Sequence, residues 1–138
     1  MKKATEIVLC YHFEDAEKLE SVRAALRKLN IEIRVLPEES WREKVGFLLG
    51  MGGFVPAPIT EENEPFLFPD EVMVLGHIKG KRLDQVLAAL KTSGGSPIRY
   101  KAIVTPYNAH WTLRRLCETM KKEHAYMTEG AKGNDGEA

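Results

Sequence analysis

The alternation of apolar and polar residues divides the chain into two similar halves, each with two strands and two helices. In the first half, residues 7–11 form a continuous apolar run, which predicts a strand covered on both faces. Leucine and valine recur at three- and four-residue spacing over residues 19–29 and predict a helix, with Asp15 at its N-cap and Asn30 just past its end. Residues 31–35 alternate between apolar and charged, as is typical of an edge strand.

A second helix and a long connection complete the first half. Pro37 ends the edge strand, and Ser40 is expected to cap a helix with four residues on one apolar stripe: Trp41, Val45, Leu48 and Leu49. Between residues 50 and 70, glycines and four prolines interrupt the regular pattern. The phenylalanines of this segment would gain by packing, so we expect a loop partly folded onto the body of the protein.

The same order of elements recurs in the second half. Residues 71–75 form another continuous apolar strand, and residues 83–90 show helical spacing. Residues 98–104 alternate like an edge strand, and Asn108 is expected to cap a fourth helix that reaches at least Met127. The expected organisation is one compact domain with four parts: a first half at 1–49, a Gly/Pro-rich connecting loop at 50–70, a second half at 71–128, and a flexible tail at 129–138.

The halves also match residue by residue. Glu6–Phe13 matches Glu71–Ile78 at a separation of 65, and the helix sequence LESVRAAL matches LDQVLAAL at 64. Two further pairs recur about 70 positions apart: Pro37 with Pro106, and Trp41 with Trp111. Any two units of this kind share apolar positions, but the ordered recurrence of histidine, proline and tryptophan favours an internal repeat.

This pattern predicts an α/β fold with one four-stranded sheet whose inner strands are the first and third. Right-handed crossovers leave two arrangements. The favoured one is a parallel sheet of order 2-1-3-4, because its second face would bury Trp41 and Trp111. The alternative is a ferredoxin-like sheet of order 4-1-3-2 with extra helices, in which the two halves run antiparallel.

Composition narrows the class of protein. The chain has 138 residues, 43% hydrophobic and 29% charged, and its 20 basic residues balance 20 acidic ones. A net charge of zero provides no long-range attraction for phosphate, so we expect no nucleic-acid partner. No apolar run approaches the roughly 20 residues that span a bilayer, and the N-terminal apolar run is short for a signal peptide. We therefore expect a cytoplasmic protein without a membrane partner, with Cys10 and Cys117 as buried, reduced thiols.

Five residues are candidates for a ligand site. His12 and His77 follow the two inner strands, and a parallel sheet would bring both to the carboxyl edge, where α/β proteins bind ligands. Histidine can act there as acid, base or metal ligand. An antiparallel arrangement would separate the two histidines. After the fourth strand, Thr105, Asn108 and His110 could face a ligand at the strand ends.

The sequence contains no Cys-x-x-Cys, no phosphate-binding glycine loop and no nucleophile elbow, so no metal and no cofactor are expected. The leading hypothesis is a non-catalytic binding or regulatory module. Its partner would be a protein or a small molecule, and the chain itself could associate as a homodimer. It would use the loop at 50–70 or the charged faces of the edge strands. The alternative is a small-molecule or metal-binding enzyme working at the strand carboxyl ends with His12, His77, Asn108 and His110.

The stretch from Lys101 to Leu113 carries the run K-A-x-x-T-P-x-N-x-x-W-T-L, and the helix after it contains Glu123-His124. In these features the chain resembles the bacterial domain family DUF3783, over Glu71 to about Tyr126. The first half resembles a companion segment that often precedes this domain. The resemblance implies a bacterial cytoplasmic protein but no activity, and it provides no functional residues to transfer.

Overall fold

The computed structural model describes residues 6–58, 66, 68–92 and 98–133. Its four strands form one sheet in the order β2-β1-β3-β4. Their bounds are Ile7–Tyr11 for β1, Glu32–Val35 for β2, Val72–Gly76 for β3 and Tyr100–Ile103 for β4. Every residue of β1 and β3 is buried, which confirms that these two strands are inner and covered on both faces.

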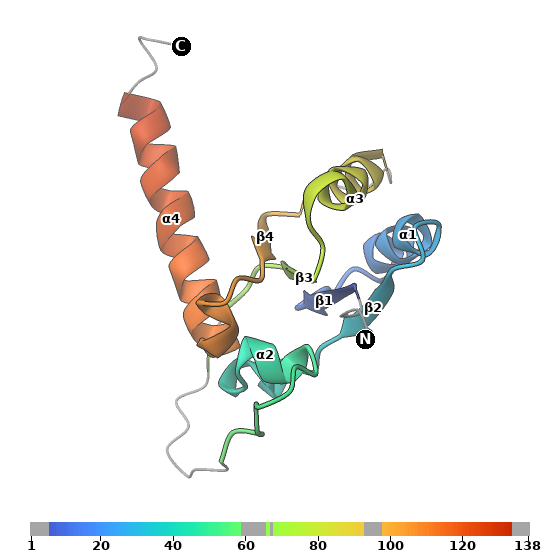
Figure 1. Ribbon diagram of the computed structural model, residues 1–138. Helices are drawn as coiled ribbons and strands as arrows, with labels where there is room; N and C mark the ends of the chain where they lie inside the picture. Colours follow the sequence, from blue (N-terminus) through green and yellow to red (C-terminus); the bar gives the residue numbers. More distant parts are fainter. Residues whose placement is uncertain (1–5, 59–65, 67, 93–97, 134–138) are drawn as a thin grey trace.

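Helices cover both faces of the sheet and make three layers. On one face lie α1 (Ala16–Arg27) and α3 (Gly80–Thr92), which pack against Val8, Cys10, Met73 and Leu75 of the inner strands. On the other face lie α2 (Val45–Leu48) and α4 (Leu113–Gly133), with a core that includes Leu9, Tyr11, Val72 and Val74 (Figure 1). Trp41 and Trp111 pack at this second face, as the sequence predicted.

The direction of the inner strands corrects the favoured prediction. β1 is parallel to β2 and β3 is parallel to β4, but β1 runs antiparallel to β3. The predicted order 2-1-3-4 is confirmed and the all-parallel sheet is wrong. The ferredoxin-like alternative has the right antiparallel halves but the wrong order, 4-1-3-2. A strand buried on both faces has the same apolar pattern in either direction, so the pattern alone does not set its orientation.

Equivalent positions of the two halves pair with each other. At the centre of the sheet Leu9 faces Val74, its counterpart at a separation of 65. Where each second strand ends, the Leu36 amide donates to the Cys10 carbonyl, and the Val104 amide donates to the Leu75 carbonyl. These pairings have the pattern that an approximate twofold axis through the middle of the inner strand pair produces.

The same symmetry joins the segments that lead into α2 and α4. The Val45 amide donates to the Trp111 carbonyl at 2.9 Å, and the Leu113 amide donates to the Glu43 carbonyl at 2.8 Å. Because the two bonds are reciprocal, Glu43 occupies in the first half the place that Trp111 occupies in the second. Trp41, which the sequence comparison aligned with Trp111, lies two positions earlier.

Both predicted caps on this face are in the wrong place for the same reason. Ser40 lies inside a 3-10 helix, η1 (Glu38–Arg42), and Asn108 begins another, η2 (Asn108–His110), whereas α2 and α4 begin several residues later. The backbone opens between each pair of helices to form the bridge between Lys44 and Thr112. The Thr112 hydroxyl then caps α4 by accepting from the Arg115 amide at 3.1 Å.

Other local predictions are confirmed. Asp15 caps α1 by accepting from the amides of Glu17 and Lys18, and Asn30 has a left-handed φ of 59°. In the connection after α2, Phe66 and Phe68 are buried in the core, so the described part of this loop does fold onto the body. Residues 59–65 and 67 of the loop lie outside the described residues.

The last helix is longer than predicted. α4 continues to Gly133, five residues into the segment expected to be a tail, and residues 134–138 lie outside the described part. None of the helices described here is both long and apolar enough to cross a membrane.

Candidate ligand-binding site

The two strand-end histidines occupy equivalent positions at opposite ends of the sheet. His12 follows β1 and His77 follows β3, and each has a left-handed φ of 61°. Because Ile7 pairs with Gly76 and Tyr11 pairs with Val72, the ends of β1 and β3 point in opposite directions. The predicted site shared by His12 and His77 is therefore wrong, since it required parallel inner strands.

Three of the five predicted residues do come together around a cavity of about 300 Å³, which we call the histidine pocket. The pocket lies where β3 and β4 end, and His77, Thr105 and His110 line it together with Lys79. Its remaining wall is apolar: Met51 and Phe54 follow α2, and Val104, Pro106 and Ala109 follow β4. The carboxyl ends of two parallel strands thus form a site without any contribution from His12.

Asn108 shapes this pocket without lining it. Its side-chain oxygen accepts from the Thr105 amide at 2.8 Å, and its own amide donates to the Thr105 hydroxyl oxygen at 3.1 Å. The side-chain amide also donates to the Ile103 carbonyl at 3.0 Å. These three bonds close the turn after β4 and hold Thr105 and His110 at the same edge of the sheet, so Asn108 is a positioning residue.

Phe54 closes the pocket against His110. The two ring centroids are 5.1 Å apart and the rings are tilted by 40°. The Phe54 ring also lies against the backbone of α2, where a Cβ at Gly46 would come within 2.5 Å of it. Gly46 therefore permits a close approach that a larger residue would prevent. Phe54, Met51 and Lys79 are site residues that the sequence did not predict, although the phenylalanines of the loop indicate that this segment packs.

Each polar side chain of the pocket can donate a hydrogen bond, and none carries a negative charge. The nine lining residues include two histidines, one lysine and one threonine, and none of the nine is acidic. A cavity of this size is at the lower end of the range for small-molecule sites. Ammonium and imidazole groups beside an apolar wall suit a small ligand that carries both an anionic group and an apolar part.

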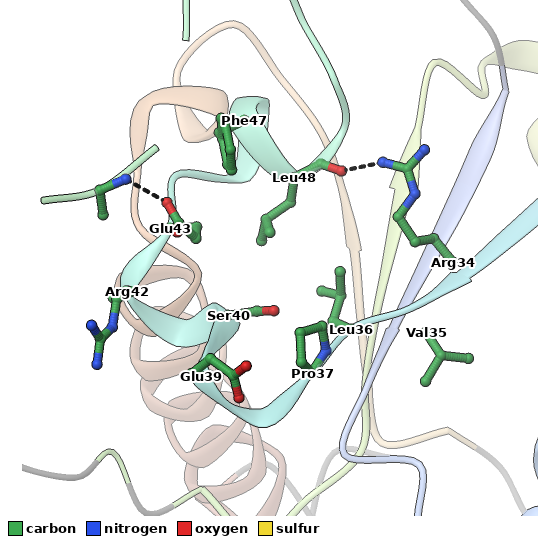
Figure 2. Close-up of a pocket in the computed structure, with 11 residues that line it drawn as sticks. Arg34, Val35, Leu36, Pro37, Glu39, Ser40, Arg42, Glu43, Phe47 and Leu48 are labelled. Atoms are coloured by element: carbon green, nitrogen blue, oxygen red, sulfur yellow. Dashed lines mark hydrogen bonds between the residues drawn. The ribbon is translucent and has the colours of Figure 1, made fainter. Parts of the chain in front are cut away.

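A second, larger hollow of about 540 Å³ lies between the end of β2, η1 and α2 (Figure 2). Its charged residues hold its walls together: Arg34 donates to the Leu48 carbonyl at 2.7 Å, and Glu43 accepts from the Ala57 amide at 2.6 Å. Two arginines and two glutamates line it, so its charges balance. None of the five predicted site residues is among its lining residues.

The two cysteines are buried within the core, as predicted. Burial raises the pKa of Cys10 from 9.0 to about 12, and it raises the pKa of Cys117 by the same amount. Burial, followed by the neighbouring charges of Cys117, Glu38 and Glu39, also raises the pKa of Tyr11 to about 12. Since the thiolate is the reactive form, neither cysteine is a nucleophile near neutral pH.

These pKa values predict a loss of stability in alkali. Below about pH 9 both thiols are protonated whether the chain is folded or unfolded. Between pH 9 and 12 the unfolded chain releases these protons and the folded chain retains them, so the free energy of unfolding falls as the pH rises. At pH 10, which is one unit above the pKa of the unfolded thiol, each thiol lowers the free energy of unfolding by about 1.4 kcal/mol. Urea denaturation at pH 8, 9, 10 and 11 measures it.

The control for this prediction is the double variant Cys10→Ala/Cys117→Ala. It starts from a lower stability at pH 8 because of the two small cavities, but its free energy of unfolding should decline less steeply above pH 9. An equal slope in the variant and the parent protein would contradict the assignment to the thiols.

The fold and site define a three-layer α/β domain with an antiparallel inner strand pair and, among the described residues, a pocket with donor side chains where β3 and β4 end. Residues 71–127 match the family model DUF3783, described as a domain of unknown function. This match confirms the resemblance to DUF3783 seen in the sequence of the second half. Searches of curated proteins and of solved structures found no match. The family segment includes His77, Lys79, Thr105 and His110, whereas Met51 and Phe54 lie before it.

Proposed function

We propose that the protein is a non-catalytic binding module that takes a small organic anion in the histidine pocket. The observation that carries this proposal is the combination of His77, Lys79 and His110 around one cavity with no acidic residue in its lining. A carboxylate or phosphate group would accept charge-assisted hydrogen bonds from these side chains. Thr105 adds a hydroxyl donor at the same edge.

The apolar wall indicates that the ligand has a second, uncharged part. Phe54 and Met51 come from the first half of the chain and line the pocket together with the polar groups at the strand ends. Burying an apolar group against them would contribute about 25 cal/mol for each Å² removed from water. A ligand with an aromatic or aliphatic body should therefore bind more tightly than an inorganic anion.

The antiparallel sheet supports binding over the enzyme hypothesis considered above. That hypothesis required His12 and His77 to act together, and the pairing of β1 with β3 puts them at opposite ends.

We infer a cytoplasmic bacterial protein from the family of its second half. We also infer that the two halves arose by duplication, because Leu9 pairs with its counterpart Val74 and the Leu36–Cys10 bond has its counterpart in the Val104–Leu75 bond.

The test is calorimetric titration with four probes: phenyl phosphate, benzoate, inorganic phosphate and benzyl alcohol. The two aromatic anions should bind, inorganic phosphate should bind more weakly, and the neutral alcohol should not bind measurably. Lys79→Gln should weaken phenyl phosphate binding by roughly tenfold or more, since a hydrogen bond to a charged group is worth about 1.5–3 kcal/mol.

The matched control is Lys81→Gln, which removes an exposed lysine from the first turn of α3, outside the pocket lining. This variant should bind phenyl phosphate like the parent protein. His77→Gln should weaken binding in the same direction as Lys79→Gln. The proposal fails if none of the four probes binds, or if Lys81→Gln loses as much affinity as Lys79→Gln.

A further inference from the structure

We propose that β2 pairs antiparallel with β2 of a second copy of this chain, centred on Ile33, so that two sheets join into one of eight strands. β2 forms one margin of the sheet, and three of its four residues are exposed: Glu32, Arg34 and Val35 (Figure 1). Val35 is a large apolar residue with 46% of its surface exposed. This edge lies on the opposite side of the sheet from β4, whose end borders the histidine pocket, so the inference is independent of the proposed function.

The backbone of β2 has hydrogen-bonding groups available for a second strand. The amide of Leu36 donates to the Cys10 carbonyl, so the backbone groups of Leu36 point toward β1. Backbone groups alternate in direction along a strand, and those of Ile33 and Val35 therefore point away from β1. Within the described residues, no backbone hydrogen bond approaches β2 from that outer side. An edge of this kind is a template for strand pairing.

The charged side chains of β2 determine which strand can pair with its outer edge and in which register. Glu32 and Arg34 are two apart, lie on the same face of β2, and have their charged groups 4.0 Å apart. In a twofold antiparallel pair centred on Ile33, each Glu32 lies directly opposite the Arg34 of the second copy. These are non-hydrogen-bonded positions, where facing side chains approach most closely. A second copy of this strand is thus complementary to it by symmetry.

Neighbouring registers lack this complementarity. Moving the centre by one residue would place Arg34 opposite Arg34, or Glu32 opposite Glu32, and like charges directly opposite each other are destabilising. The other edge of the sheet differs as well. β4 carries Lys101 and no acidic residue, and Arg99 precedes it, so it offers no self-complementary pair. Lysine on an edge strand commonly protects that edge from pairing.

The experiment is sedimentation velocity over a series of protein concentrations with charge-reversal variants. The parent protein should form a dimer that weakens as the salt concentration rises, because the facing charges are exposed. Glu32→Arg and Arg34→Glu should each weaken the dimer by roughly tenfold or more, since each places like charges opposite each other in both symmetry-related pairs. The double variant E32R/R34E should dimerise like the parent, because both pairs are restored with their signs exchanged.

Mixing the two single variants gives a further readout. A chain with arginine at both positions is complementary to a chain with glutamate at both, so the mixture should form heterodimers while each variant alone stays monomeric. Lys101→Glu, on the opposite edge, is the matched control and should leave the dimer unchanged. Circular dichroism of each variant checks that the chain is folded.

Hydrogen exchange tests the backbone part of the proposal. The amides of Ile33 and Val35 should exchange more slowly as the protein concentration rises, while the amide of Lys101 should not respond. A parent protein that is monomeric at every concentration overturns the proposal, and so does a dimer that both single reversals leave intact. A monomer that captures a different protein on this edge also overturns it. None of these outcomes bears on anion binding in the histidine pocket.

Discussion

Replacing Phe68 by alanine should lower the free energy of unfolding by about 3–5 kcal/mol, the range for removing a buried aromatic ring. Phe68 is 3% exposed and belongs to the core between the sheet and α4. Its ring centroid is 5.5 Å from that of Phe66 and 5.4 Å from that of Tyr100, so it joins the end of the connecting loop to β4. The substitution leaves a cavity and also removes the contact that ties the loop to the body.

Urea denaturation followed by circular dichroism measures this loss. If the slope of the free energy of unfolding against urea concentration is the same as in the parent protein, the native state stays compact. Val55→Ala provides the control within the same connection. Val55 is 75% exposed, and the substitution should change stability by less than about 0.5 kcal/mol. A loss below about 1 kcal/mol for Phe68→Ala would mean that the loop does not pack as described.

Leu9→Ala should cost about 2–5 kcal/mol, because it removes an isobutyl group from the centre of the sheet. Leu9 is completely buried, faces Val74 across the inner strand pair, and packs in the core on the side of α2 and α4. Strands on both sides and helices above leave little freedom for the surroundings to collapse into the cavity, which favours the upper part of that range.

Leu87→Ala is the matched control, since it makes the same chemical change at a helix position that is 37% exposed. Its cost should be well below that of Leu9→Ala, at about 1 kcal/mol or less. Equal costs at the two positions would contradict the central place of β1. Both measurements are best made in dilute solution, so that any pairing through β2 does not contribute to the apparent stability.

The candidate site was partly visible in the sequence. His77, Thr105 and His110 could be selected because each is a polar residue just after a predicted strand, and strand ends in α/β folds are where ligands bind. Lys79 stands in the same connection but resembles any surface lysine in the sequence. Phe54 and Met51 become site residues through the folding of a distant loop onto these strand ends, and nothing local in their sequence indicates that contact.

The sequence by itself determined which segments are strands and helices, and which strands are inner. The continuous apolar runs of β1 and β3 require cover on both faces, and the alternation of β2 and β4 requires cover on one face. Asp15 and Asn30 end the helix between them through contacts and backbone geometry within the adjoining turns. These are local consequences of burial and backbone geometry, so they can be predicted without knowing where any other segment lies.

Tertiary structure alone decided the direction of β3 against β1 and the starts of α2 and α4. Reversing a buried strand changes none of its apolar pattern, so direction depends on which end of the sheet the connecting loop reaches. The bridge between Lys44 and Thr112 likewise forms between segments far apart in the sequence, and it interrupts helices that local propensity would have continued. His12 and His77 are separated for this reason, and the histidine pocket is formed by the ends of β3 and β4 together with a loop from the other half.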